Sequence, residues 1–313
     1  MLAFIFRRVI SAVVLVMVVS FLSFMLTWAI PGDPARAILG IAGTAEQVSL
    51  KRAELGLDRN AFVAYADWLG HALTGDLGRS WFTSQDVAGS ISSKLPVTLS
   101  ITLVAVLVAG AAGLGLGLLA AARRGSIDRA IQPIAILGFA IPNFIVAIAL
   151  LTAFAVNLRI FPATGYTALT DDPVQWMRSI TLPVIALAVG AGASVAQQTR
   201  NAAIFTLGQE YIRTLRGRGL RPSAIYLKHV LRNSAPVALT VLSLQFIGLL
   251  SGAVVIEYMF ALPGIGALIV GASAQKDQPV IQGTVVVVVV VVVVVNLFMD
   301  LIYGWLNPKV RVR

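Results

Sequence analysis

Long apolar stretches alternate with shorter polar segments along most of this chain. Six of the stretches are long enough, or nearly long enough, to cross a bilayer, because a spanning helix needs about 20 consecutive apolar residues. The predicted spans cover residues 9–30, 96–122, 133–156, 180–203, 235–256 and 284–306. The pattern therefore predicts an all-α membrane protein with about six transmembrane helices, and the first stretch is expected to be a retained anchor.

Two of the stretches contain residues that affect the shape of the helix. Eleven consecutive valines fill residues 285–295, a run that favours a strand in water. An open strand in lipid leaves its backbone groups unpaired, so the run is predicted to be helical. Pro142 lies inside the third stretch and is expected to kink that helix, either as a plain bend or as a hinge for gating.

The composition agrees with a membrane protein. Of 313 residues, 58% are apolar and only 12% are charged, and the mean hydropathy is +0.87. Soluble domains average about 45–50% apolar and about 25% charged residues. The formal charge of +10 is spread between the apolar runs and not gathered in one patch, so no nucleic acid partner is predicted. The chain has no cysteine and two histidines, His71 and His229, so no metal site is predicted.

The distribution of the basic residues predicts an orientation in the membrane. With the N-terminus inside, the inside segments hold 15 of the 24 lysines and arginines. The outside segments hold nine, together with ten acidic residues, whereas the inside segments contain only Asp128 and Glu210 as acids. Because inside loops are enriched in Lys and Arg, both termini are predicted to be cytoplasmic.

Patterns that would indicate catalysis or autonomous transport are missing from the sequence. It contains neither a Gly-Lys-Ser/Thr phosphate loop nor a Gly-x-Ser-x-Gly elbow. Glu257 and Asp300 lie near opposite ends of different spans, so no carboxylate pair and no mid-membrane acid is predicted. An intramembrane enzyme and a proton-coupled carrier are therefore disfavoured, and the energy source is expected on another chain. A structural scaffold is argued against only by the segment described next.

The segment 208–232 combines two short amphipathic halves around glycines. Ile212 and Leu215 give the first half an apolar face, and Gly217 and Gly219 are expected to break that helix. Pro222 suits the first turn of a second helix. Such an element can insert into a groove of a partner protein, and a basic loop lying on anionic lipid is the alternative.

Two sets of positions within the spans favour close contacts or a polar lining. Gly113 and Gly117 are four residues apart, a spacing that lets helices approach closely. Gln197, Arg200 and Asn201 share one face near the end of the fourth span. These three residues are candidates for lining a transport pathway, and packing against a partner helix is the alternative.

The run Glu210 to Leu220, EYIRTLRGRGL, resembles the cytoplasmic EAA loop of permease subunits in bacterial ABC importers. Glu210 and Gly219 occupy the characteristic glutamate and glycine positions of that loop, whereas Leu215 and Gly217 replace its usual small residues. Other blocks resemble the first permease of dipeptide and oligopeptide systems in the same order along the chain: Pro31–Pro34, Gly75–Ser80, Arg123–Ser126, Ile141–Phe144, Phe161–Tyr166, Glu257–Phe260, Pro263–Gly266 and Asn307–Lys309.

The resemblance implies a type I ABC importer (MetI-like) permease fold in the bacterial inner membrane. It implies a single permease domain over residues 1–313, with an extracytoplasmic loop at 31–95 and the coupling loop at 207–234. The extracytoplasmic loop is expected to dock a binding protein or to cap the outer mouth. The implied substrates are di- and oligopeptides, and the alternatives are nickel, haem or another small solute in the same importer class, or a stand-alone secondary carrier or channel.

The resemblance also implies partners and residue roles. A second homologous permease, two cytoplasmic ATPase subunits or domains, an extracytoplasmic substrate-binding protein and membrane lipid are the expected partners. No cofactor is expected on this chain, with ATP and Mg on the partner ATPase. Glu210, Tyr211, Arg213 and Arg216 are expected to contact the ATPase. Gly219 is expected to form the elbow of the loop, and a simple helix stop is the alternative.

Overall fold

A computed structural model describes residues 2–123 and 125–306 of the chain. Arg124 and the predicted tail block Asn307–Lys309 lie outside the described residues. Within the described residues the regular elements are helical, and the only β-type pairing is an isolated antiparallel bridge between Arg79 and Asp86.

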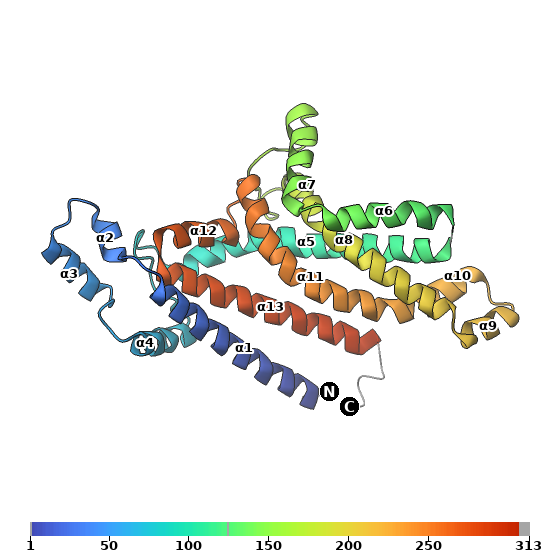
Figure 1. Cartoon of the computed structure of the whole chain (residues 1–313), viewed down its shortest axis with the longest axis horizontal. Helices are drawn as coiled ribbons and strands as arrows, with labels where there is room; N and C mark the ends of the chain where they lie inside the picture. Colours follow the sequence, from blue (N-terminus) through green and yellow to red (C-terminus); the bar gives the residue numbers. More distant parts are fainter. Residues whose placement is uncertain (1, 124, 307–313) are drawn as a thin grey trace. The chain divides into compact units, whose positions relative to one another are not determined.

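The helices follow one another along the chain, and the longest connections between them are residues 74–86 and 158–172 (Figure 1). The α-helices are α1 (Leu2–Ala29), α2 (Pro34–Leu39), α3 (Ala45–Glu54), α4 (Ala61–Leu73), α5 (Val87–Ala122), α6 (Ser126–Ala140), α7 (Asn143–Leu150), α8 (Pro173–Leu207), α9 (Glu210–Gly217), α10 (Pro222–Ala224), α11 (Leu231–Met259), α12 (Ile265–Gln275) and α13 (Gln278–Leu306). Two π-helical segments, η1 (Leu151–Asn157) and η2 (Ile225–Val230), continue α7 and α10.

Five described helices are long and apolar enough to cross a membrane, and a bent pair raises the number to six. The five are Phe6–Ala29, Val87–Ala122, Pro173–Leu207, Pro222–Met259 and Gln278–Gly304. The prediction of an all-α protein with about six spans is confirmed, and the polyvaline run is helical, as predicted.

The third predicted span is a broken helix and not a kinked one. α6 ends at Ala140, α7 begins at Asn143, and the two axes meet at 101°. Pro142 explains the break, because proline lacks the N–H of a continuing helix and disfavours helical backbone at the preceding residue. Ile141 accordingly adopts extended backbone, with φ −79° and ψ 123°.

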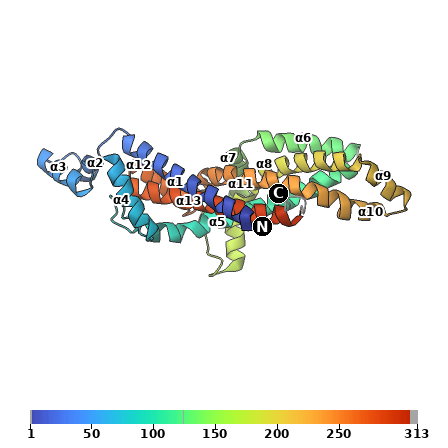
Figure 2. The same ribbon diagram turned by 90° about the horizontal axis from the view of Figure 1, so that it is seen from below.

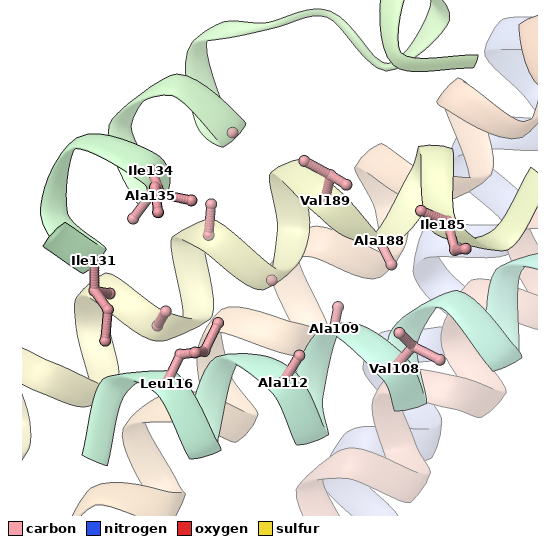
Figure 3. Close-up of a pocket in the computed structure, with 14 residues that line it drawn as sticks. Val108, Ala109, Ala112, Leu116, Ile131, Ile134, Ala135, Ile185, Ala188 and Val189 are labelled. Carbon is pink, nitrogen blue, oxygen red and sulfur yellow. The ribbon is translucent and has the colours of Figure 1, made fainter. Parts of the chain in front are cut away.

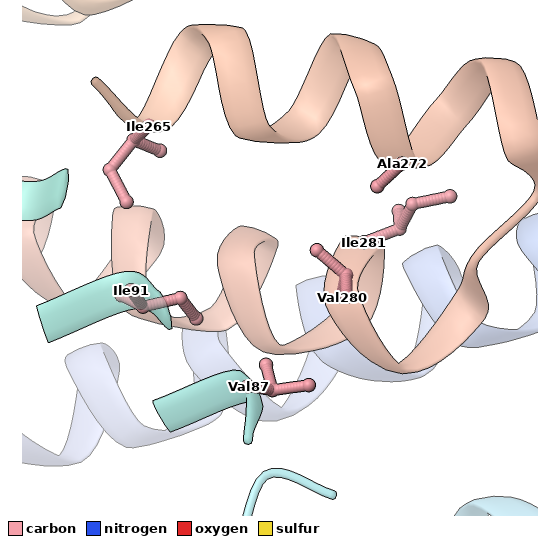
Figure 4. Packing of buried hydrophobic residues seen from close by; sticks show 6 residues of the cluster. All are labelled: Val87, Ile91, Ile265, Ala272, Val280 and Ile281. Carbon is pink, nitrogen blue, oxygen red and sulfur yellow. The ribbon is translucent and has the colours of Figure 1, made fainter. Parts of the chain in front are cut away.

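The chain forms two compact units, each with its own core. The first unit contains the chain up to Pro96 together with Pro263–Val294, and the second contains Val97–Leu262 and the chain from Val295 onward. The core of the first unit is a cluster from the start of α5, from α12 and from the start of α13 (Figure 4). Its buried members are Val87, Ile91, Ile265, Ala272, Val280 and Ile281. The single-domain organisation stays a prediction.

In the first unit, the region 31–95 contains three short helices that the hydrophobic pattern did not predict. Asp33 caps α2 by accepting hydrogen bonds from two backbone N–H groups of its first turn, and Pro34 follows at the first helical position. Thr44 and Gln47 form a reciprocal capping box at the start of α3. Asn60 caps α4. The region is therefore folded structure and not an extended loop.

In the second unit α8 is the central helix, packed against α6, α7 and α11 (Figure 1). α5 approaches α8 closely at the predicted small residues. A Cβ atom on Gly113 would lie 2.6 Å from Cβ of Val195, and one on Gly117 would lie 2.6 Å from the carbonyl oxygen of Ala196. Gly113 and Gly117 therefore pack α5 against α8, in agreement with the predicted intramembrane packing.

Candidate functional site

The predicted coupling segment begins with α9, which rests on an apolar cluster of its own unit. Ile212 of α9 is fully buried and packs with Ala121 at the end of α5 and Ala203 near the end of α8. Ile225 and Val230 of η2 complete the buried cluster. The apolar face predicted for this segment is therefore used inside the second unit, with Ile212 inserted into the chain's own core.

The opposite face of α9 is exposed and charged. The four residues predicted to contact an ATPase, Glu210, Tyr211, Arg213 and Arg216, are all exposed. Tyr211 is positioned further by Asn233, whose Nδ2 atom donates a hydrogen bond to the Tyr211 hydroxyl at 3.1 Å. α9 and α10 lie at the same end of the second unit as the last turn of α5 and the first turn of α6 (Figures 1 and 2). The basic helix α9, with Arg213 and Arg216, therefore shares this end of the unit with Arg123 and Arg129.

Gly219 ends α9 in a Schellman arrangement and turns the chain. Its backbone is left-handed, with φ 77°. The Gly219 N–H donates to the carbonyl of Arg216 at 3.0 Å, and the Leu220 N–H donates to the carbonyl of Leu215 at 3.2 Å. Gly217 is the last residue of α9, so the helix ends between Gly217 and Gly219, where the sequence predicted the break. Gly219 is therefore both the helix stop and the position at which the chain turns, and its role in coupling stays a prediction.

The second half of the coupling segment is not a separate short helix. Pro222 occupies the first helical position, as predicted, but the helix then continues through η2 into α11. The run Pro222–Met259 counts as one candidate span. The segment 218–222 is therefore joined directly to the start of a candidate spanning helix.

The three predicted pathway residues lie on α8 in different surroundings. Gln197 is half-buried and Asn201 is exposed, whereas Arg200 is held by Asp128 at the start of α6. Nε of Arg200 donates a hydrogen bond to Oδ1 of Asp128, and Nη2 of Arg200 donates one to Oδ2, each at 2.6 Å. This bidentate pair joins α8 to α6. A pathway role for the three residues stays a prediction.

An apolar cavity of about 300 Å³ lies between α5, α6 and α8 (Figure 3). Its lining includes Ala112 and Leu116 of α5, Ile134 of α6, and Val189 of α8. Among the lining residues, none carries a polar side chain. The cavity suits hydrocarbon and offers no side-chain hydrogen bond to a peptide.

Sequence reasoning missed a buried carboxylate in each unit. Glu257 near the end of α11 is fully buried and accepts a hydrogen bond from the Thr98 hydroxyl at 2.5 Å. Asp277, 3% exposed, accepts hydrogen bonds from the Ser80 hydroxyl and from the Trp81 N–H, the latter at 3.1 Å. Glu257 and Ser80 both belong to blocks identified in the sequence, but the pairing of distant residues is not readable from one sequence.

The chain matches two family descriptions that together cover nearly all of it. Residues 113–312 match the binding-protein-dependent transport system inner membrane component, and residues 1–102 match the N-terminal part of such membrane components. The chain belongs to this family. It is therefore a multi-pass membrane permease subunit of a binding-protein-dependent transporter, and the resemblance recognised in the sequence is confirmed.

Relatives and a solved structure extend this assignment. The permease is 38% identical to a Brucella abortus protein named as a peptide transport system permease, over 99% of both chains. It is 37% identical to the dipeptide transport system permease DppB of Bacillus subtilis, over 95% of this chain and 94% of that one. A chain of the MetNI methionine ABC transporter, solved in inward-facing conformations, matches with a TM-score of 0.57 and 19% identity. That match covers 69% of this chain and 96% of the other, and it shows the MetI-like fold.

Proposed function

We propose that this permease is one half of the membrane pathway of an ATP-driven importer of di- and oligopeptides. It pairs with a second homologous permease, and two ATPase subunits or domains bind below the pair. The observation that carries the proposal is α9, whose buried Ile212 anchors it and whose other face exposes Glu210, Tyr211, Arg213 and Arg216. ATP and Mg belong to the ATPase partner, and an extracytoplasmic binding protein delivers the peptide.

The packing of α9 supports a way for ATP binding to act on the membrane helices. Closure of the ATPase dimer displaces α9, and the Ile212 contact with Ala121 and Ala203 transmits that displacement to the ends of α5 and α8. Because protein interiors are close-packed, a shift at this joint moves whole helices. The differential contacts of the ATPase in its open and closed states then bias the pathway between inward and outward arrangements.

The folded region 31–95 is the proposed docking surface for the binding protein. Its three helices carry capped ends and many exposed polar side chains, which suits a protein contact better than a flexible loop does. Glu46, Lys51 and Arg52 of α3 lie on or near its surface and offer both signs of charge to a partner.

Peptides are the proposed substrate because the relatives at 37–38% identity carry names of peptide and dipeptide systems. In a strain whose only peptide importer contains this chain, deletion of its gene is expected to abolish growth of an auxotroph on di-, tri- and tetrapeptides. Nickel uptake, measured in parallel, is expected to be unchanged. Loss of nickel uptake with unchanged growth on peptides contradicts the assignment.

A reconstitution separates the importer from a stand-alone carrier. Liposomes that contain only this purified chain are expected to show neither peptide flux nor ATP hydrolysis. Liposomes that contain the complete complex are expected to show both when the binding protein and peptide are supplied outside. Peptide flux through the chain alone favours a carrier or channel.

The proposed orientation places both termini and the segment 207–234 in the cytoplasm of a bacterial inner membrane. Because the chain has no cysteine, single introduced thiols report their side directly. Ser223 of α10 and Ser49 of α3 are both exposed. A membrane-impermeant thiol reagent is expected to label Ser49→Cys in intact cells and Ser223→Cys only after lysis. Labelling of Ser223→Cys in intact cells overturns the orientation.

A further inference from the structure

Two adjoining cavities lie in the first unit, beside the ends of α1 and α13. One has a volume of about 180 Å³ and includes Phe24, Trp68 and Gln282 in its lining. The other has a volume of about 190 Å³. Trp28 and Gln278 line both cavities, so they share a wall.

Three residues that line the 180 Å³ cavity have buried polar atoms without a hydrogen bond. Among the described residues, no hydrogen-bond partner reaches Nε1 of Trp68, Nε2 of Gln278 or Oε1 of Gln282. Gln278 is 7% exposed and Gln282 is fully buried. Buried polar groups in proteins are nearly always paired, and each unpaired one costs about 1–3 kcal/mol. Two N–H donors and one carbonyl acceptor at one cavity therefore indicate a polar occupant that both accepts and donates.

The charged side chains and aromatic rings that line the cavities indicate which charges and hydrogen-bonding groups the occupant carries. Arg59 pairs with Asp67 at 3.0 Å, and Arg52 lies 3.8 Å from Asp33, so these four charges balance. Lys276 donates to the carbonyl of Pro31, a neutral group, and adds one positive charge to the lining. The tryptophan rings of the lining offer π faces to a cation. The site thus suits a group with one anionic centre and a donating, amine- or hydroxyl-bearing end.

The position of the cavities relative to the membrane indicates which group with an anionic centre and a hydrogen-bond donor is available to fill them. Trp28 lies one residue before the end of the span Phe6–Ala29, and Gln278 begins the span Gln278–Gly304. The ends of spans mark the boundary between hydrocarbon and headgroups, where tryptophans gather. A phosphodiester with a hydrogen-bond-donating head is the anionic group that membranes present at this depth.

We propose that this pair of cavities binds the headgroup of one membrane phospholipid. The phosphate oxygens accept hydrogen bonds from Trp68 Nε1 and Gln278 Nε2, with Lys276 balancing the charge. The amine or hydroxyl end of the headgroup donates to Gln282 Oε1. The bound lipid fixes the outer ends of α1 and α13 at headgroup depth.

Native mass spectrometry tests the proposal on the full chain, reconstituted with phosphatidylethanolamine and phosphatidylglycerol and then washed with detergent. The wild type is expected to retain one phospholipid. Trp68→Phe, which keeps an aromatic ring beside Phe24 and Tyr65, is expected to lower its occupancy at least tenfold. Gln278→Leu is expected to act likewise.

Matched substitutions in the second unit serve as controls, because Trp176→Phe and Gln198→Leu make the same chemical changes away from the cavities. Both are expected to retain the lipid. Excess inorganic phosphate is expected to leave it in place, and displacement by phosphate overturns a headgroup site. A wild type that holds no lipid means that the cavities contain only water. If Trp68→Phe and Gln278→Leu retain as much lipid as the two control variants, the lipid binds elsewhere. Either result overturns the proposal.

Discussion

Gly219→Val is expected to reduce peptide transport to less than about a tenth of the wild-type rate while the chain still inserts into the membrane. Gly219 has φ 77°, a conformation that costs residues with a side chain about 1–2 kcal/mol, and β-branched valine tolerates it worst. A Cβ atom there meets no described atom within 4 Å, so the effect is conformational and not steric. The valine is expected to unwind the Schellman turn and to displace α9 from the start of the helix at Pro222. Uptake of labelled peptide, normalised to the amount of chain in the membrane, measures the loss.

Two matched variants show whether the backbone conformation is the cause. Gly219→Asn introduces a side chain that accepts left-handed backbone, and it is expected to keep most of the transport activity. Gly217→Val places the same valine two residues earlier, at the last helical position, where a Cβ atom also meets open space. It is expected to transport normally. Normal transport by Gly219→Val shows that the turn has no coupling role, and equal losses at both positions assign the effect to bulk on the exposed face.

The sequence predicted the spans well because their length is imposed by the bilayer and their composition by lipid. The same reasoning failed where a helix changes direction within the membrane. Pro142 indicated a bend, but the 101° angle between α6 and α7 depends on what packs around the break. Asn143 illustrates this, since a Cβ atom added to Gly190 on α8 or to Gly252 on α11 would lie 3.3 Å from its amide atoms. Those contacts come from helices distant in the sequence.

The short helices of the first unit were missed for a different reason. Hydrophobic periodicity is weak over ten residues, so α2 to α4 gave no clear signal. Their caps were readable, however: Thr44 and Gln47 have the spacing of a capping box, and Asp33–Pro34 has the order of an N-cap and a first helical residue. A search for caps in place of apolar runs would have found these helices.

The sequence indicated which residues of α9 are exposed, but it did not indicate what the apolar residues of the same helix pack against. Glu210, Arg213 and Arg216 were identified from local motif and charge, and they lie on one exposed helix as expected. The apolar residues of the same helix were expected to lie in a partner's groove or on anionic lipid. Ile212 is buried in the chain's own second unit instead. Periodicity reveals an apolar face, but it carries no information on whether the covering surface belongs to the same chain.

Gly117→Val is expected to have the largest effect on the folded protein, because α5 and α8 touch at this residue. A Cβ atom on Gly117 would lie 2.6 Å from the carbonyl oxygen of Ala196 and 2.7 Å from Cβ of Thr199, distances that real side chains do not reach. The helices must separate, and overpacking of this kind costs about 1–3 kcal/mol or more. We expect a marked fall in the amount of folded chain in the membrane and in its unfolding temperature in detergent.

Gly115→Val, two residues earlier in the same helix, meets no described atom within 4 Å and is expected to behave like the wild type in both measurements. Equal stability of the two variants contradicts the close approach of α5 and α8, whereas a loss confined to Gly117→Val supports α8 as the packed centre of the second unit.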